Sequence, residues 1–593
     1  MSATSADANL RAALTLLEAL RHCGLRRLVL CPGSRSAPLA VAAGVLASRG
    51  LDLFTAVDER SAAFLALGLG RADGLPAAVV TTSGTAVANL LPAVVEADSG
   101  ALPLLLLTAD RPARLKGCGA NQTVNQEAFL APCCRLMAEG SPAGLARMGE
   151  PALRELAASA WRACLGAPPG PVHLNLPFEE PLHVAAAALT AASAAIAANE
   201  TQGEPPPESP QLRMPAEVAA AWPGLDPDRP GVVVAGPWRG TMAALAPFAE
   251  ALRRWQRRSG WPVLADALSG LRGWPGLELV HGYDLLLAEG HGLPAAPQLL
   301  RLGPMPASRR LQQWIAACCG PQLLITEADP RNRDAGIPAT ARWPHGLEAG
   351  LSLQPGGPAS AAAANRALAR AWLEADAACQ RALDDALETG ACTEPGLARR
   401  LSRALPPGLA VMLASSSPVR DWESFAAADA PHRPLFGFRG ASGIDGTLSL
   451  AAGLACSTGA LVLLTGDLAL LHDANGWLWR HQLEARGARL CVVLVDNGGG
   501  GIFEQLPIRL PEGSAVMDFE RLFAMPQALD HRQLAAGYGA ASRALASLDE
   551  LEDALAWGLQ QPMALLELRT DRRADAETRR QLRRRMAQLS ARP

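Results

Sequence analysis

What this chain of 593 residues lacks already limits its function. Its longest apolar stretches, such as residues 102–107, have the length of a strand, whereas a membrane-spanning helix needs about 20 apolar residues. The net charge is -3, which gives no reason to expect nucleic acid as a partner. The N-terminus carries no apolar secretory signal. We therefore expect a cytoplasmic protein that binds neither membranes nor nucleic acid.

Cysteine motifs and lysine are scarce as well. The 12 cysteines include the adjacent pairs Cys133-Cys134 and Cys318-Cys319 but no Cys-X-X-Cys, so reduced thiols are the expected state. Lys116 is the only lysine, and because nearly every cation is therefore an Arg, an isolated Arg is a weak indication of anion binding. The arginines of residues 579–585 follow a helical pattern with acids just upstream, which favours a solvated helix face.

What is present is an alternation of strand-sized apolar runs with segments of helical apolar spacing. This alternation predicts an α/β protein, and a chain of this length is too long for one core. We expect three doubly wound parallel-sheet domains, over residues 1–185, 216–365 (the central domain) and 366–593, the last including a lead-in helix. Residues 186–215 are rich in Ala and Pro, which is typical of a linker.

Two polar turns in the third domain indicate a binding site. An apolar run at residues 461–464 leads into Gly466-Asp467, and a second run at 490–495 ends in Asp496-Asn497, followed by four glycines. A helix-length segment between the runs predicts parallel strands whose carboxyl ends lie side by side, where open α/β sheets bind ligands. An acid and a carboxamide flanked by glycines suit Mg²⁺ bridging a diphosphate, although either turn alone is an ordinary sequence after a strand.

This pair of turns resembles the thiamine-diphosphate motif of the decarboxylase and synthase superfamily, in which Gly-Asp-X is followed by an Asn after one crossover. The resemblance implies three domains of the thiamine-diphosphate enzyme type, with thiamine diphosphate as the cofactor. It also implies that Asp467, Asn497 and the main-chain carbonyl of Gly499 bind Mg²⁺ or Mn²⁺. Two positions depart from the motif: Asp496 replaces a second Asn, and Ala469 stands where relatives often carry a hydroxyl near the diphosphate.

Glu59 opens an Ala- and Leu-rich helical segment in the first domain. On its own, an acid in a first helical turn usually compensates the helix dipole or caps the helix. The resemblance implies another role, because Glu59 stands where the superfamily has the glutamate that activates the cofactor. In addition to Glu59, Asp467 and Asn497, the residues implied to contact the cofactor are Thr85, Asn89, Ser416, Ser442, Ile444, Leu468 and Ile502.

Longer stretches resemble one branch of the superfamily, the menaquinone-pathway synthases that join 2-oxoglutarate to isochorismate, over nearly the whole chain. These stretches are Cys31-Pro-Gly-Ser-Arg-Ser36 and residues 58–61, 82–89, 108–112, 118–122, 439–446 and 502–503. The resemblance implies decarboxylation of 2-oxoglutarate and addition of the succinyl carbanion equivalent to isochorismate, which gives 2-succinyl-5-enolpyruvyl-6-hydroxy-3-cyclohexene-1-carboxylate and CO₂. It also implies a homodimer or homotetramer with the active site between subunits.

The two substrates offer a check on this resemblance, because each carries two carboxylates and needs bidentate cations and amides. Loops at predicted strand ends and the central domain offer such groups: Ser34, Arg35, Arg111, Asn121, Gln122, Arg309, Arg310, Arg420 and Arg439. By resemblance, Arg420 and Arg439 hold 2-oxoglutarate, and the residues nearer isochorismate are Arg35, Arg111, Gln122, Arg309 and Arg310. Arg309 departs from a Lys-Arg pattern of the branch, and an exposed helix start is the alternative for the Arg309-Arg310 pair. Ile502, Phe503 and Leu506 would exclude water from the reaction.

Other functions remain open from the sequence. An acetolactate-type synthase or a simple 2-oxoacid decarboxylase handles small monoanions and has less use for many arginines. A non-catalytic regulator that binds the cofactor is disfavoured by the presence of Glu59, Asp467 and Asn497. A nicotinamide dehydrogenase is disfavoured because no Gly-X-Gly-X-X-Gly opens a helix after a strand with a suitably placed acid.

Overall fold

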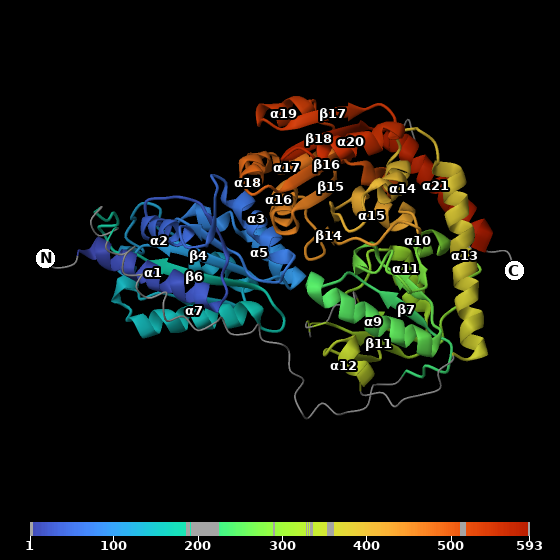
Figure 1. Ribbon diagram of the computed structural model, residues 1–593, viewed down its shortest axis with the longest axis horizontal. Helices are drawn as coiled ribbons and strands as arrows, with labels where there is room; N and C mark the ends of the chain where they lie inside the picture. Colours follow the sequence, from blue (N-terminus) through green and yellow to red (C-terminus); the bar gives the residue numbers. More distant parts are fainter. Residues whose placement is uncertain are drawn as a thin grey trace. The chain divides into compact units, whose positions relative to one another are not determined.

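The computed structural model describes residues 4–185, 190, 225–288, 291–327, 329, 331, 336–352, 361–509 and 517–590. The chain divides into two compact units. The first unit is Met1–Gln211 with Arg439–Ser457, and the second is Leu212–Phe438 with Thr458–Pro593. The first unit holds one six-stranded sheet and the second holds two, as Figure 1 shows. The linker expected at residues 186–215 lies outside the described residues except for Thr190.

The first sheet is parallel throughout, with strand order β2-β1-β3-β4-β6-β5. Its strands are β1 (Arg27–Leu30), β2 (Asp52–Thr55), β3 (Ala78–Thr81), β4 (Leu104–Asp110), β5 (Leu136–Glu139) and β6 (Pro171–Pro177). Among its described residues, the first unit has the helices α1 (Ser5–Cys23), α2 (Ala37–Ala47), α3 (Glu59–Arg71), α4 (Thr85–Ala88), α5 (Leu91–Gly100), α6 (Glu127–Leu130), α7 (Glu150–Leu165) and α16 (Thr447–Thr458), whose last residue belongs to the second unit.

Alternating strand residues bury both faces of this sheet. Leu28, Val80 and Leu105 belong to one buried apolar cluster with residues of α1, α2 and α7, so they lie on the face that these helices cover. The intervening residues Val29, Val79 and Leu104 are also fully buried, and α3 packs against β1, β3 and β4. A sheet covered on both faces accounts for the continuous apolar runs of its strands.

Helix α16 packs against α3 at a pair of glycines. A Cβ on Gly68 would lie 2.2 Å from the carbonyl oxygen of Leu450, and a Cβ on Gly453 would lie 2.2 Å from that of Leu65. Real side chains cannot approach a backbone this closely, so only glycine allows the two helices to meet. This contact joins α16 and the loop before it to α3, the helix that begins at Glu59.

The central sheet has the strand order β12-β11-β10-β7-β8-β9, again parallel. Its strands are β7 (Val232–Ala235), β8 (Val263–Ala265), β9 (Leu279–Val280), β10 (Leu299–Leu302), β11 (Gln322–Ile325) and β12 (Ala341–Trp343). The accompanying helices are α9 (Met242–Ser259), α10 (Tyr283–Leu286), α11 (Arg309–Ala317), α12 (Leu347–Ser352) and the long α13 (Ala363–Leu387). This order corresponds to that of a dinucleotide-binding doubly wound sheet.

The third sheet has the order β14-β13-β15-β16-β18-β17, which repeats that of the first sheet, strand for strand. Its strands are β13 (Ala410–Leu413), β14 (Leu435–Gly437), β15 (Ala460–Gly466), β16 (Arg489–Asp496), β17 (Ala541–Leu545) and β18 (Met563–Arg569). Its helices are α14 (Glu394–Ala404), α15 (Ser417–Phe425), α17 (Asp467–His472), α18 (Arg480–Ala485), α19 (His531–Gly537), α20 (Leu551–Gly558) and α21 (Arg572–Ser590). The predicted fold class, three doubly wound parallel-sheet domains, is confirmed.

The arginines near the C-terminus are a partial exception to the predictions. Arg580 and Arg585 keep side chains 43% and 48% exposed on α21, as expected of a solvated face. Arg579 is only 2% exposed, so the prediction was wrong for this residue. Its guanidinium pairs with Glu394 and Asp421, and these two carboxylate partners offset the free-energy cost of its burial.

Candidate active site

The predicted pair of turns in the third domain comes together as expected. β15 and β16 are adjacent and parallel, with Gly466 opposite Val495, so Asp467 and Asn497 follow neighbouring strands at one edge. The Asp467 carboxylate accepts two backbone hydrogen bonds, from Leu468 N to Oδ1 at 2.7 Å and from Gly499 N to Oδ2 at 2.7 Å. Burial raises the pKa of Asp467 to about 6, and a bound cation would favour its ionised form.

The side-chain amide of Asn497 uses only one of its two polar atoms in a hydrogen bond. Its side-chain nitrogen donates to Glu394 Oε1 at 2.8 Å, whereas Oδ1 has no hydrogen-bond partner among the described residues. The residue is only 9% exposed, and burying an acceptor that has no hydrogen-bond donor costs free energy unless a ligand binds to it. Asp467 and Asn497 therefore fit a cation that prefers oxygen ligands, such as Mg²⁺ or Mn²⁺.

The other predicted metal ligand, the Gly499 carbonyl, lies in a tightly packed turn. Gly499 has a φ of +116°, and a Cβ there would lie 1.9 Å from the Ala524 carbonyl oxygen. Its own carbonyl accepts from Gly501 N at 2.9 Å, which leaves a second lone pair. The described residues hold no cluster of three or more His, Cys, Asp or Glu side chains arranged for a metal. Asn497 Oδ1 and the Gly499 carbonyl are the oxygens that could bind a metal together with the Asp467 carboxylate.

Glu59 is the first residue of α3, and its neighbour Asp58 performs the capping. The Asp58 carboxylate accepts from Arg60 N at 2.9 Å and Ser61 N at 3.2 Å. Glu59 is half-buried and accepts from Asn89 Nδ2 at 3.3 Å, so two predicted cofactor residues are in contact. Thr85, at the start of α4, is exposed. Since Asp58 caps the helix, capping does not account for Glu59.

Two of the predicted substrate arginines are buried in the first unit. Arg35 Nη1 donates to the Phe178 carbonyl at 3.0 Å and Nη2 pairs with Glu180 at 2.8 Å. Arg111 donates to Ser83 Oγ and to the Gln122 carbonyl. Burial and then the charge of Arg35 lower the pKa of Arg111, whereas the carboxylates of Asp110 and Glu180 oppose this shift. The predicted polar partners Ser34, Asn121 and Gln122 are exposed.

The loop that carries Arg439, Ser442 and Ile444 is held by Glu96 of α5, a residue that the sequence analysis missed. The Glu96 carboxylate accepts from the backbone N–H groups of four successive residues, Arg439 to Ser442, at 3.1, 2.8, 2.6 and 3.0 Å. Glu96 is only 5% exposed. The four bonds fix the backbone path of this loop within the first unit.

Backbone strain also concentrates at predicted site residues. Among the described residues, positive φ outside glycine occurs at Ala101, Gln122, Ser416, Ser442 and Met525. Gln122, Ser416 and Ser442 are predicted site residues, and Met525 follows the segment that contacts Gly499. Such conformations cost about 1–3 kcal/mol each and persist where the surroundings impose them, typically at functional sites.

The second unit places the remaining predicted residues on several elements. Ser416 precedes α15, and its carbonyl accepts from Arg420 Nη1 at 2.7 Å. Leu468 lies on α17. Ile502 and Phe503 lie on a 3₁₀ turn, Gly501–Gln505, with Leu506 directly after it, and all three are half-buried. Phe503 packs against Phe523, with 5.5 Å between ring centroids.

Arg309 and Arg310 begin α11 and differ in their surroundings. Arg309 is exposed, as the alternative of a helix start predicted, whereas Arg310 pairs with the Asp284 carboxylate and donates to its carbonyl. Asp284 also accepts from Ser308 and from Ser424 of α15. Burial would raise the pKa of Asp284, but Arg310 and the two hydroxyls hold it below its ordinary value.

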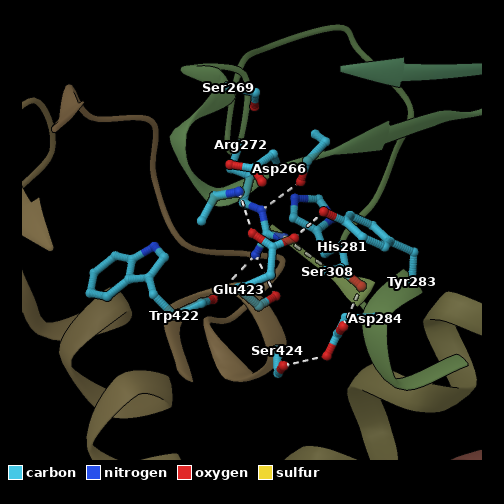
Figure 2. A network of polar contacts seen from close by, with 12 residues as sticks. Asp266, Ser269, Arg272, His281, Tyr283, Asp284, Ser308, Trp422, Glu423 and Ser424 are labelled. Atoms are coloured by element: carbon cyan, nitrogen blue, oxygen red, sulfur yellow. Dashed lines mark hydrogen bonds and ion pairs between the residues drawn. The ribbon is translucent and has the colours of Figure 1, made fainter. Parts of the chain in front are cut away.

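Figure 2 shows Asp284 with Ser308 and Ser424, and beside them Glu423, which accepts from Tyr283 and Arg272. Through these two acids, α15 of the third domain is joined to α10 of the central domain.

Comparison with known proteins identifies the family. Residues 10–129 match the family described as "Thiamine pyrophosphate enzyme, N-terminal TPP binding domain", and residues 214–412 match "Middle domain of thiamine pyrophosphate". The chain is 57% identical to the 2-succinyl-5-enolpyruvyl-6-hydroxy-3-cyclohexene-1-carboxylate synthase of Synechococcus sp. (strain RCC307), over 98% of each chain. It is 51% identical to the same-named protein of Prochlorococcus marinus (strain MIT 9313), over 94% of this chain and 97% of the relative.

The chain belongs to this synthase family.

Membership confirms the resemblance drawn from the motifs, whereas the individual site residues remain predictions. Three buried residues that contact predicted site residues or hold their loops were missed: Glu96, Glu394 and Gln126. Gln126 accepts from Gly84 N and donates to the Ala109 carbonyl and Asn175, so it ties together the loops after β3 and β4. Each partner is distant in sequence, and no local motif marks such contacts.

Proposed function

We propose that this chain decarboxylates 2-oxoglutarate and joins the succinyl unit to isochorismate, with thiamine diphosphate and Mg²⁺ or Mn²⁺, in menaquinone biosynthesis. The product is 2-succinyl-5-enolpyruvyl-6-hydroxy-3-cyclohexene-1-carboxylate, with release of CO₂. The observation that carries the proposal is 57% identity over 98% of both chains to a synthase of that name. The orphan Oδ1 of Asn497, beside the carboxylate turn of Asp467, supports the metal and cofactor part.

Thiamine diphosphate, when bound, supplies a nucleophilic carbon and accepts the electron pair that decarboxylation leaves. Asp467, Asn497 and the Gly499 carbonyl would hold the metal, which would neutralise the charge of the cofactor's diphosphate. Glu59, with Asn89, would hold its aminopyrimidine ring through a carboxylate hydrogen bond to a ring nitrogen. Thr85, Ser416, Ser442, Ile444, Leu468 and Ile502 would complete the cofactor contacts.

The arginines would select substrates by charge. Arg35 and Arg111 are buried cations, and although Arg35 also pairs with Glu180, two guanidinium groups that can bind carboxylates in a bidentate manner suit a dicarboxylate. We assign isochorismate to this pair, with Ser34, Asn121, Gln122, Arg309 and Arg310. We assign 2-oxoglutarate to Arg420 and Arg439. Ile502, Phe503 and Leu506 would exclude water from the reacting carbon.

The proposed assembly is a homodimer or homotetramer with the active site between subunits. Exposed apolar side chains support an apolar partner surface on the first unit. Val57, two residues before Glu59, is 79% exposed, and Val124 and Phe129, around the Gln122 loop, are 40% and 36% exposed. None of the described helices combines the length and apolarity needed to cross a bilayer. We propose a cytoplasmic location.

A steady-state assay tests this function. Isochorismate loss and CO₂ release are followed with 2-oxoglutarate, isochorismate, thiamine diphosphate and Mg²⁺, each omitted in turn. We expect coupled consumption that requires all four components. CO₂ release without isochorismate loss would show that the acceptor is wrong. Absence of both signals with confirmed cofactor binding would favour a regulatory protein.

A further inference from the structure

Glu394 lies at the first position of α14, where its neighbour Thr393 already caps the helix through a bond from Gly396 N at 3.1 Å. Its carboxylate is therefore available for other contacts. Oε1 accepts from Asn497 Nδ2 at 2.8 Å, and Oε2 accepts from Arg579 Nη2 at 2.6 Å. The residue is only 4% exposed, so both contacts are shielded from water.

These contacts decide which way the Asn497 amide faces. A carboxylate only accepts hydrogen bonds, so it must face the NH₂ group of the amide and not its oxygen. With Nδ2 turned to Glu394, Oδ1 is directed to the other side, where it has no partner among the described residues. The proposed metal needs this oxygen, because an NH₂ group cannot bind a cation.

Arg579 fixes Glu394 in turn. Its Nε and Nη2 donate to the two oxygens of Asp421 at 2.8 and 2.6 Å, and Nη2 also reaches Glu394. Arg579 is 2% exposed, which gives Glu394 a buried positive partner as well as a fixed rotamer. Asp421 shares this partner but makes no contact with Asn497 among the described hydrogen bonds.

We propose that Glu394 is a positioning residue for the metal site, which turns the Asn497 amide so that Oδ1 faces the cation. The inference rests on the proposed function, since it assumes that Asn497 binds the metal. Outer-shell partners of this kind typically change metal affinity by about 10–100-fold when they are replaced.

The Glu394→Gln variant tests this role. Gln has one acceptor oxygen, for which Arg579 and Asn497 compete, and the charged guanidinium is the stronger donor. The Gln NH₂ group then faces Asn497, whose amide turns its oxygen away from the metal. We expect the affinity for Mn²⁺, titrated by electron paramagnetic resonance with thiamine diphosphate present, to fall by about tenfold or more. Asp421→Asn is the matched control, because Asp421 is the other carboxylate that accepts from Arg579, but it makes no described hydrogen bond to Asn497.

A double variant separates positioning from stability. In Glu394→Gln with Asn497→Asp, the amide and the carboxylate exchange places at unchanged total charge. The introduced amide can then donate to one oxygen of the new carboxylate while the other oxygen faces the metal. We expect this variant to regain Mn²⁺ affinity relative to Glu394→Gln alone.

Three results would overturn the inference: wild-type affinity in Glu394→Gln, equal losses in Glu394→Gln and Asp421→Asn, or no recovery in the double variant. A wild-type chain that binds no Mn²⁺ with the cofactor would overturn the metal site itself.

Discussion

Single buried side chains of the first sheet form a polar network that reaches the loops carrying the predicted substrate residues. His173 is fully buried in β6, and its Nε2 lies 2.7 Å from Thr108 Oγ1. Thr108, Asn175 and Gln126 continue the network to the loops after β3 and β4. Because its members are buried as well as hydrogen-bonded, this network holds these loops in place. It requires the His173 side chain to be neutral.

This dependence predicts acid sensitivity. Burial lowers the pKa of His173 to about 4 from an ordinary value of 6.5. Between these values the unfolded chain binds a proton that the native state does not, so stability falls as the pH falls, by about 3 kcal/mol in total. We expect the melting temperature of the first domain to fall more steeply from pH 6.5 to 4 in the wild type than in His173→Gln. Identical slopes would assign the acid sensitivity to other groups.

At the scale of elements, two contacts hold α16 and its preceding loop within the first unit. One is the glycine contact between α3 and α16, and the other is the set of four bonds to Glu96. Together they fix the predicted cofactor residues Ser442 and Ile444 relative to the helix that begins at Glu59.

The glycine contact predicts a large effect of one methyl group. Gly453→Ala places a Cβ 2.2 Å from the Leu65 carbonyl, so α3 and α16 must separate. We expect a loss of about 1–3 kcal/mol in stability, together with weaker cofactor binding. Gly44→Ala in α2 is the control, because a Cβ there meets nothing within 4 Å and should stabilise the helix by about 0.5–1 kcal/mol. Equal melting temperatures in the two variants would contradict this account of the contact.

The Glu96 contact predicts an effect on substrate binding. In Glu96→Gln, an NH₂ group faces backbone donors, so part of the loop from Arg439 to Ser442 loses its acceptor. We expect the KM for 2-oxoglutarate to rise by about tenfold, which corresponds to about 1.4 kcal/mol and is within the range for a lost charged hydrogen bond. Glu150→Gln, which removes an exposed charge of α7, should leave the KM unchanged. A KM in Glu96→Gln equal to that of the wild type would remove Glu96 from its role in holding the loop.

The elements differ in how far the sequence predicts them. β15 and β16 consist largely of buried Leu and Val and follow from the apolar pattern. β18 reads Met-Ala-Leu-Leu-Glu-Leu-Arg, which favours a helix by intrinsic propensity, yet its place between β16 and β17 makes it a strand. Neighbouring strands decide such segments, and a single sequence does not reveal them.

At the scale of the whole molecule, the sequence predicts the architecture and the site better than the contacts that support the site. The motifs around Asp467, Asn497 and Glu59 correctly indicated the family. Glu394 lies 103 residues from Asn497 and 185 residues from Arg579, so nothing local distinguishes it from an ordinary acid in a first helical turn. Arg579 itself was expected in solvent, because helical spacing does not show which partners a distant segment provides.

The first and third sheets have the same strand order, so two domains of similar fold have different proposed roles. In both, the predicted residues follow strands at carboxyl ends, as in other doubly wound sheets. In the proposed function, Glu59 of the first domain and Asp467 with Asn497 of the third have different roles toward the cofactor. Glu59 would act in catalysis, whereas the other two would hold the metal.

The Glu59→Gln variant tests this claim most directly. Turnover of 2-oxoglutarate and isochorismate is measured beside Mn²⁺ binding in the presence of thiamine diphosphate. We expect turnover to fall below detection while Mn²⁺ binding stays close to that of the wild type, because the replaced carboxylate is not among the proposed metal ligands. Near-normal turnover in Glu59→Gln would contradict the account.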